Sequence, residues 1–184
     1  MTTYRVARGV AVLLLLMAFG ACKKKQAGSP AADGELAVTA EPTGVTWKRI
    51  SMPFGSLELP IDPGWNLVGT DVQGPGDIVI MLQSQDGITV AQLDEYLAQY
   101  GEFRQRESPK YAASATVKGK VSGAAAVRVE GAFDDGTKFV TRDYLVFGDR
   151  EVVVLSAHAP EAEAARLTGV VDHAARTLQL GAAK

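Results

Sequence analysis

Residues 124–157, AAAVRVEGAFDDGTKFVTRDYLVFGDREVVVLSA, contain the pattern that decides the fold. Apolar and polar side chains alternate along 127–133, as they do along a strand that buries one face. The segments 134–137 and 148–149 have the composition of tight turns. Just upstream, 115–121 alternates in the same way and is followed by a Ser-Gly turn. We therefore expect four strands joined by short turns, an antiparallel meander.

The turn at 134–137 also predicts how the second and third of these strands pair. A three-residue loop over 135–137 would place Phe133 opposite Phe139, Val127 opposite Leu145, Glu130 opposite Arg142 and Asp134 opposite Lys138. These are favourable cross-strand pairs. The same register sets Val129 opposite Asp143 and so places an acid on the apolar face. We expect a wrong register or a sheet end at this point; the alternative is that Asp143 is a buried acid.

Further strands are expected upstream of the meander. Leu57–Ile61 alternates and predicts a half-buried strand, and Asp62–Trp65 is a Pro-Gly turn followed by a tryptophan that should anchor the core. A short strand is expected at Leu67–Val68 and a loop over 70–77. The solidly apolar segment 78–82 predicts a central strand covered on both faces.

Two helices are expected, one before and one after the meander. Thr89 and Gln92 have the spacing of a capping box, which predicts a helix that begins at Val90, and Gly101 is placed to end it. Its expected buried stripe is Val90, Leu93, Leu97 and Tyr100. Pro160, with acids after it, predicts the first turn of a last helix. The stripe of that helix, expected to lie on the sheet, is Leu167, Val170, Val171, Ala174 and Leu178.

This order of elements predicts an α+β fold, a mostly antiparallel sheet packed between helices as an α/β/α sandwich. The segments 57–60 (LELP) and 62–65 (DPGW), the one helix after the first strands, and the closing helix that ends in Arg176-Thr177-Leu178 resemble the PsbP/DcrB-like domain, which includes bacterial lipoproteins of the LpqN type. The resemblance covers 47–180 of an expected single domain at 45–184. It implies a non-catalytic adaptor that docks on a larger assembly, and it carries over no metal-binding residue.

The first residues predict the compartment in which this domain folds. Two arginines precede the apolar run 10–19, which is shorter than the ~20 residues of a transmembrane helix and predicts a secretory signal peptide over residues 1–21. The end of that segment, Phe19-Gly20-Ala21-Cys22, resembles a bacterial lipobox. The resemblance implies that Cys22, the only cysteine, becomes the lipidated first residue and anchors the protein to a membrane. The alternative is a plain secretory signal whose cleavage site happens to contain a cysteine.

The segment after the anchor is expected to be a leash. Residues 22–44 are rich in Ala, Gly, Pro, Ser and Thr, with Leu36 and Val38 as the only large aliphatic side chains, so we expect a disordered tether. Such a coil would let the domain move ~25 Å from the bilayer. Three lysines at 23–25 either contact anionic headgroups or simply begin a solvated linker. Because Lys23 stands where many inner-membrane lipoproteins have Asp, resemblance to that sorting rule favours the periplasmic side of the outer membrane.

No set of reactive side chains stands out. His158 and His173 lack metal-ligand spacing and are expected at the surface or a boundary. The Asp-Asp-Gly at 134–136 is expected to be a hairpin turn and not a calcium loop, and the Gly-Pro-Gly at 74–76 lacks the lysine and spacing of a phosphate loop. The aromatic residues Trp47, Phe54 and Trp65 are expected to pack in or around the core and not to line a ligand groove. We predict no catalytic residue, no cofactor and no metal site.

Two functions from different classes remain open. Over 45–184 there are eighteen acidic and fourteen basic side chains, evenly mixed, so we expect no nucleic-acid partner. The first hypothesis is a tethered, non-enzymatic docking or assembly factor of the bacterial envelope with a protein partner. The second is a carrier that holds a lipid or small hydrophobic ligand between sheet and helix. A cavity lined by Trp65, Ile80, Leu97 and Val171 would favour the carrier, whereas a closed core with an exposed apolar patch would favour docking.

Overall fold

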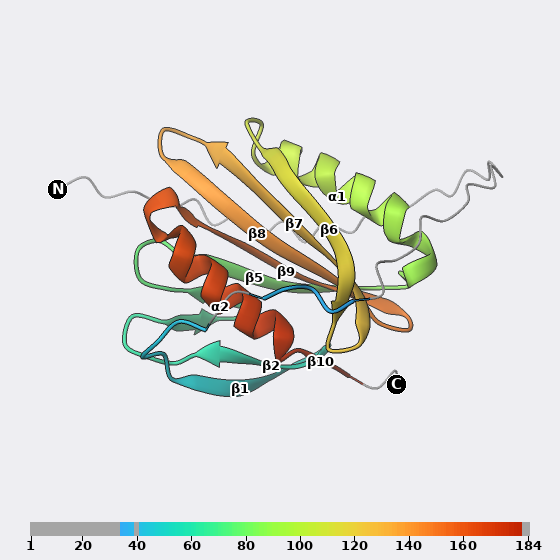
Figure 1. Cartoon of the computed structure of the whole chain (residues 1–184), viewed down its shortest axis with the longest axis horizontal. Helices are drawn as coiled ribbons and strands as arrows, with labels where there is room; N and C mark the ends of the chain where they lie inside the picture. Colours follow the sequence, from blue (N-terminus) through green and yellow to red (C-terminus); the bar gives the residue numbers. More distant parts are fainter. Residues whose placement is uncertain (1–33, 39–40, 182–184) are drawn as a thin grey trace. The chain divides into compact units, whose positions relative to one another are not determined.

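The computed structural model describes residues 34–38 and 41–181 (Figure 1), so the predicted signal peptide, Cys22 and most of the predicted tether lie outside the described residues. The strands are β1 Trp47–Met52, β2 Gly55–Pro60, β3 Asn66–Val68, β4 Asp71–Gln73, β5 Val79–Asp86, β6 Ala112–Val121, β7 Ala124–Asp134, β8 Lys138–Phe147, β9 Glu151–Pro160 and β10 Gln179–Leu180. The helices are α1 Leu93–Glu107 and α2 Ala164–Arg176, each preceded by a 3₁₀ turn.

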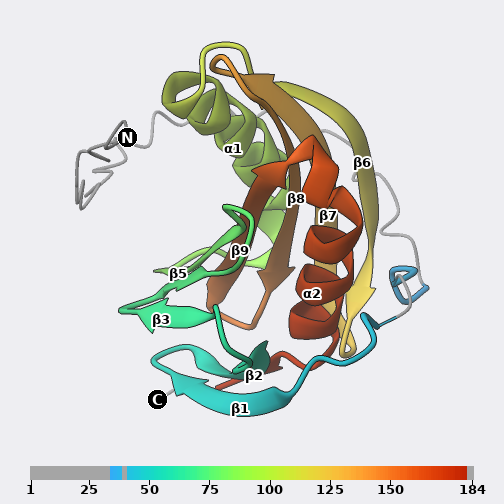
Figure 2. The same cartoon turned by 90° about the vertical axis from the view of Figure 1, so that its left-hand side faces the viewer.

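Seven strands form one antiparallel sheet, in the order β3-β4-β5-β9-β8-β7-β6. Helix α1 lies on one face of this sheet and α2 on the other (Figure 2). A second sheet, β1-β2-β10, lies on the α2 side (Figure 2). The predicted α+β architecture, with an antiparallel sheet packed between helices, is therefore confirmed.

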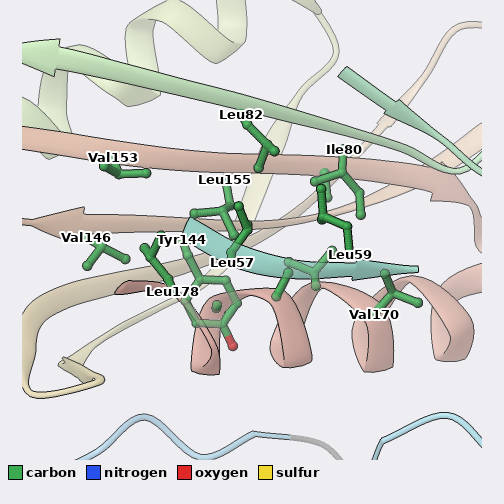
Figure 3. Close-up of a cluster of buried hydrophobic side chains, with 14 of the residues drawn as sticks. Leu57, Leu59, Ile80, Leu82, Tyr144, Val146, Val153, Leu155, Val170 and Leu178 are labelled. Atoms are coloured by element: carbon green, nitrogen blue, oxygen red, sulfur yellow. The ribbon is translucent and has the colours of Figure 1, made fainter. Parts of the chain in front are cut away.

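The larger hydrophobic cluster lies on the α2 face of the sheet. Leu57 and Leu59 of β2 point toward Ile80 and Leu155 of the large sheet, and Val170 of α2 adds to the same layer (Figure 3). All five residues of the stripe predicted for the last helix are buried, namely Leu167, Val170, Val171, Ala174 and Leu178. Each leucine or valine among them contributes roughly 1.5–3 kcal/mol when it leaves water, so this face holds α2 firmly.

The smaller hydrophobic cluster lies under α1. The sequence pattern predicts the start of this helix correctly but not its end. The backbone N–H of Thr89 donates to Gln92 Oε1 at 3.1 Å, the capping contact that the spacing predicts. The predicted end at Gly101 is wrong, because the helix continues to Glu107. Phe103 and Arg104 continue the inward face one turn further, so burial favours more helix where the glycine alone would favour a stop.

The strands before α1 follow the predictions in part. Short strand β3 is confirmed, but the expected loop over 70–77 contains β4, whose only apolar residue, Val72, offers too short a pattern to detect. Strand β5 lies between β4 and β9, as a central strand should. Its Ile80 and Leu82 are fully buried, while Val79 and Met81 are half-buried, so only one face is closed completely.

The meander and its register are confirmed. Strand β7 pairs with β8 so that Phe133 lies opposite Phe139 and Val129 lies opposite Asp143. The two phenyl rings stack with centroids 5.0 Å apart. Our preference for a wrong register or a sheet end is therefore incorrect: Asp143 is 0 % exposed and lies in the middle of β8. The apolar pattern placed it correctly, and a partner from another element makes its burial tolerable.

The predicted disorder of the tether is wrong for residues 34–38. This segment runs beside β6, with a parallel bridge between Glu35 and Lys120, and Leu36 is 6 % exposed within the larger cluster. Burial of one leucine and two backbone hydrogen bonds to β6 offset part of the entropy that is lost when this segment is ordered. The composition of the segment does not reveal these contacts. No helix within 34–38 and 41–181 has the length and apolar character needed to cross a bilayer.

Candidate functional site

The edge of the large sheet formed by β3 exposes apolar side chains. Leu67 is 46 % exposed and Val68 is 58 % exposed, and Ile61, just before the preceding turn, is 50 % exposed. Because neighbouring residues of a strand point to opposite faces, neither face of β3 is covered. Strand β3 is also the last strand on its side of the sheet, so its outer backbone groups have no ladder partner among the described strands. We call Ile61, Leu67 and Val68 the β3 edge.

Trp65, just before β3, packs against the larger hydrophobic cluster. A Cβ atom added to Gly74 would lie 2.5–2.8 Å from the Trp65 ring, so the glycine lets the indole pack closely against the backbone just after β4. Trp65 and Trp47 are half-buried against the core, and Phe54 is 3 % exposed inside it. The prediction that these aromatic residues serve packing is confirmed for the described structure.

A buried polar cluster lies beneath α1, and we call it the α1 cluster. Its members are Tyr100, Arg104, Tyr111, Thr141, Asp143 and Ser156, all buried. Arg104 Nε lies 3.6 Å from Asp143 Oδ2, and Arg104 Nη1 donates to Ser156 Oγ at 3.1 Å. Asp143 Oδ1 accepts from Ser156 Oγ at 3.1 Å and from the backbone N–H of Ala157 at 3.0 Å. The helix is thus held to the sheet by a charge pair as well as by apolar contacts.

The two charges shape the acid–base properties of this cluster. Burial raises the pKa of Asp143, while the Arg104 guanidinium and the hydrogen bonds oppose that rise. Burial and the nearby Asp143 carboxylate raise the pKa of Tyr100 well above its usual value. Tyr111 lies over Gly131, where any side chain would collide with its ring, and it offers a face to the Arg104 guanidinium at 5.0 Å. These groups are arranged to keep one buried ion pair in place.

A second buried polar cluster lies beneath α2. Arg142 Nε and Nη2 donate to the two oxygens of Asp172 at 2.6 and 2.9 Å, and the Tyr144 hydroxyl donates to Asp172 Oδ1 at 2.7 Å. Arg142 also donates to Glu130 at 2.6 Å, which confirms the predicted cross-strand pair. Burial and the Asp172 carboxylate raise the pKa of Tyr144 to about 12. Strand β8 therefore places charged or polar side chains on both faces of the sheet in turn.

His173 is not the surface or boundary residue that we expected. It is 6 % exposed, and its ring stacks on Trp47 with centroids 3.7 Å apart. Its Nε2 lies 3.0 Å from Glu58 Oε2 and its Nδ1 lies 3.1 Å from Glu41 Oε1. The hydrogen bond to His173 lowers the pKa of Glu58. His173 is buried because β1 and β2 cover the polar side of α2, which the helical pattern alone leaves facing water.

His158 is half-buried at the end of β9, as a boundary residue should be. Its ring makes edge-on contacts with Phe133 and Phe139, with centroids 5.9 Å away in each case. Burial, together with the positive charge of Arg104, lowers the pKa of His158 to about 4. This histidine is therefore neutral at neutral pH and serves as a packing partner of the phenyl pair.

The remaining motifs take the structural roles that we expected. In the turn after β7, Asp134 Oδ1 accepts from the backbone N–H of Gly136 at 2.9 Å, which is hairpin-turn geometry. Gly136 has a φ of 109°, a conformation that favours glycine. In the part of the chain that the structure describes, no group of three or more His, Cys, Asp or Glu side chains is arranged to hold a metal ion. The predicted lipidation site Cys22 lies outside that part.

The four residues proposed to line a carrier cavity do not lie together. Ile80 and Val171 belong to the cluster on the α2 face, whereas Leu97 packs on the cluster under α1. The sheet separates these two faces, so Leu97 cannot line a cavity with Ile80 and Val171. The pattern of a helix shows which of its residues are buried but not which face of the sheet they pack on.

Sequence reasoning also missed the polar partners in both clusters. Arg104 lies beyond the predicted helix, and Asp172 lies within the apolar stripe predicted for the last helix. The one available signal is an acid in an otherwise apolar pattern. Asp143 occupies an apolar position of its strand, and Asp172 directly follows Val170 and Val171. Such a position requires a cationic or hydroxyl partner from another element.

Comparison with known proteins identifies the fold. No family model and no curated protein sequence matches the chain. Among solved structures, the domain is similar to cyanobacterial PsbP from Synechocystis, with a TM-score of 0.59 and 10 % identity over 79 % of this chain and 99 % of that one. It is also similar to LpqN of Mycobacterium tuberculosis, described as involved in cell envelope biogenesis, with a TM-score of 0.53 and 14 % identity over 76 % of this chain and 93 % of that one. A Pseudomonas aeruginosa protein of unknown function matches with a TM-score of 0.53 and 16 % identity over 74 % and 99 % of the two chains. The domain therefore has the PsbP/LpqN-type fold.

Proposed function

We propose that this chain, a domain of the PsbP/LpqN-type fold, is a lipid-anchored protein of the bacterial envelope that docks without catalysis on a partner protein. The observation that carries the proposal is the β3 edge, where Leu67 and Val68 are exposed on opposite faces of the last strand of the sheet. An uncovered apolar edge strand is a site for strand addition by a partner, with backbone hydrogen bonds and alternate side-chain contacts.

Other features support a docking role over a carrier role. Both faces of the large sheet are packed, one by α2 with β2 and the other by α1. The residues proposed to line a ligand cavity lie on different faces. LpqN, which shares the fold, is described as involved in cell envelope biogenesis, and this agrees with an envelope location for a chain whose residues 19–22 resemble a lipobox. The anchor would be Cys22, on the periplasmic side of the outer membrane.

The proposal is tested by site-specific photo-crosslinking in intact bacterial cells that express the chain. A crosslinking amino acid is placed at Val68 on the β3 edge and, as a control, at Val117, which is also exposed but lies on β6 at the opposite edge. Affinity purification then identifies the captured molecules. We expect a single stoichiometric envelope protein from position 68 and none from position 117.

A matched pair of variants checks that the edge binds this partner. The double variant Leu67→Glu/Val68→Glu should lose the crosslinked partner, whereas Val117→Glu, a charge at an exposed site on the opposite edge, should retain it. Cys22→Ser should remove the chain from the membrane fraction and weaken capture. Equal capture at both positions, or a co-purifying lipid in place of a protein, would argue against docking and favour the carrier.

A further inference from the structure

Residues 34–38 and 41–46 form a segment that we call the strap. The backbone N–H of Leu36 donates to the carbonyl of Lys120 at 2.8 Å, and the N–H of Lys120 donates to the carbonyl of Gly34 at 3.0 Å. At the end of β6, the N–H of Gly123 donates to Glu35 Oε1 at 3.0 Å. The start of the strap therefore extends the large sheet beyond β6 as a short parallel addition.

A glycine in β6 leaves room for this segment to approach closely. A Cβ atom added to Gly119 would lie 2.8 Å from the Gly34 carbonyl oxygen and 2.8 Å from Leu36 Cδ2. Glycine weakens a strand interior, and it is found where another backbone approaches closely. Leu36 in turn is 6 % exposed and belongs to the main hydrophobic cluster. A close backbone approach and a buried side chain together indicate a fitted contact.

The strap is also held further along. Arg128 Nη1 donates to the carbonyl of Ala37 at 2.5 Å. Beyond residue 40, Glu41 forms ion pairs with Arg176 and with His173 of α2. The backbone N–H of Thr46 then donates to an Asp62 carboxylate oxygen at 2.7 Å, just before β1 begins. These contacts tie the strap to β7, to α2 and to the turn after β2.

The strap and the β3 edge lie at opposite ends of one sheet. Strand β6 is last in the strand order and β3 is first. The six spacings between seven strands, at about 4.8 Å each, separate the two edges by about 29 Å. The chain thus leaves the domain toward its N-terminus at the end of the sheet that lies farthest from the β3 edge.

We propose that the strap takes up half of the predicted leash and so turns the β6 end of the domain toward the membrane and the β3 edge away from it. The inference rests on the proposed anchor at Cys22. With residues 34–38 held against β6, eleven residues (23–33) separate the domain from Cys22; a coil of that length would typically reach about 17–20 Å, whereas one over 23–44 would reach about 23–28 Å. Because the strap attaches this segment at the β6 edge, that edge would lie on average within about 20 Å of the lipid surface, whereas the β3 edge is about 29 Å further along the sheet.

The test uses the mature, lipidated chain in liposomes that contain lipids with a quencher on the headgroup. A fluorophore is attached to a cysteine introduced as Val117→Cys on β6 or as Val68→Cys on β3, both exposed positions. We expect position 117 to be quenched at least about twofold more than position 68, because a leash of this length confines the β6 end. Equal quenching at the two positions would overturn the inference.

Two variants release the strap by different means. Gly119→Ala places a methyl group against the Gly34 carbonyl and Leu36, and Leu36→Asp puts a charge into the cluster that the leucine fills. Both should bring the quenching ratio close to one. Gly101→Ala, which adds the same methyl group where no atom lies within 4 Å, should leave the ratio unchanged. A ratio that survives both strap variants would show that something other than the strap orients the domain.

A second measurement follows the strap itself and is independent of the membrane. In the soluble Cys22→Ser chain, hydrogen exchange should show protected amides at Leu36 and Lys120, the two donors of the strap pairing. Gly119→Ala should lower that protection by about tenfold or more while the amides of α2 remain protected. Unprotected amides in the parent chain would overturn the strap.

The outcomes separate this inference from the proposed function. A chain that floats with liposomes but is quenched equally at both positions would keep the anchor and lose the orientation. A chain that does not float would remove the anchor, and the orientation with it. Neither result bears on capture at the β3 edge, which the crosslinking experiment measures separately.

Discussion

Removing Arg104 from the α1 cluster should destabilise the domain strongly. The variant Arg104→Met keeps the length and apolar stem of the side chain but leaves the Asp143 carboxylate, which is 0 % exposed, without its cation. Breaking a buried pair in this way costs about 3–5 kcal/mol, out of a total stability of about 5–15 kcal/mol. At about 2–4 °C per kcal/mol for a domain of this size, the melting temperature should fall by about 6–20 °C.

The cost should depend on pH in a defined direction. Burial already raises the pKa of Asp143, and loss of Arg104, which lowers that pKa, would raise it further. Above the unfolded-state pKa of ~3.9, the folded state would then hold a proton that the unfolded state releases, so the penalty grows as pH rises. Below that pKa both states are protonated and the penalty disappears. The loss should therefore be largest near neutral pH and shrink as pH approaches about 4.

Urea unfolding of the soluble Cys22→Ser chain, followed by tryptophan fluorescence, measures these changes, with an unchanged denaturant slope as the sign that only stability has moved. Arg106→Met, an exposed arginine on the same helix, is the matched control and should change stability by less than about 0.5 kcal/mol. The double variant Arg104→Met/Asp143→Leu should recover most of the loss, because an apolar pair removes the unpaired charge. A cost no larger than that of the control, or one independent of pH, would refute the role assigned to the ion pair.

Three further outcomes test other parts of the structure. In the folded parent chain the pKa of His158 is lowered to about 4, so the unfolded state binds the proton first on acidification. The free energy of unfolding of the parent should therefore fall by about 2 kcal/mol between about pH 8 and pH 5. His158→Phe should reduce this fall, as urea unfolding at the two pH values would show. Tyr144→Phe should cost about 1.5–3 kcal/mol in the same assay, because it removes a hydrogen bond to the buried Asp172 carboxylate. Gly101→Ala should raise the melting temperature and the free energy of unfolding, the latter by up to about 1 kcal/mol, because the residue is inside α1 and a Cβ there meets no atom within 4 Å. A lower melting temperature would mean that the glycine is needed for a reason that the packing does not reveal.

Patterns of a few residues were sufficient for most of the fold. The alternation in β7 and β8 and the turn between them predicted the register, which also holds at Asp143, where we expected it to fail. The capping residues Thr89 and Gln92 predicted where the helical segment begins. Both signals are local, because side-chain period and turn stereochemistry are properties of adjacent residues.

Predictions failed where the outcome depended on a distant segment. Helix α1 passes Gly101 because the sheet surface offers a place for Phe103 and Arg104. His173 is buried because β1 brings Trp47 over it. The segment at Leu36 is ordered because Gly119, far along the chain, leaves room for it. None of these causes is visible in the residues surrounding the feature that it decides.

The sequence by itself determined the strands of the meander, their turns and register, the stripe of α2 and the α+β class, since each follows from periodicity and turn chemistry within one short segment. Only the tertiary structure decided which helix covers which face of the sheet, and with it the partners of Asp143 and Asp172, the separation of Leu97 from Ile80, and the attachment of the strap to β6. The physical reason is that the energy of a buried charge, or of an ordered polar segment, depends on groups brought beside it from elsewhere in the chain.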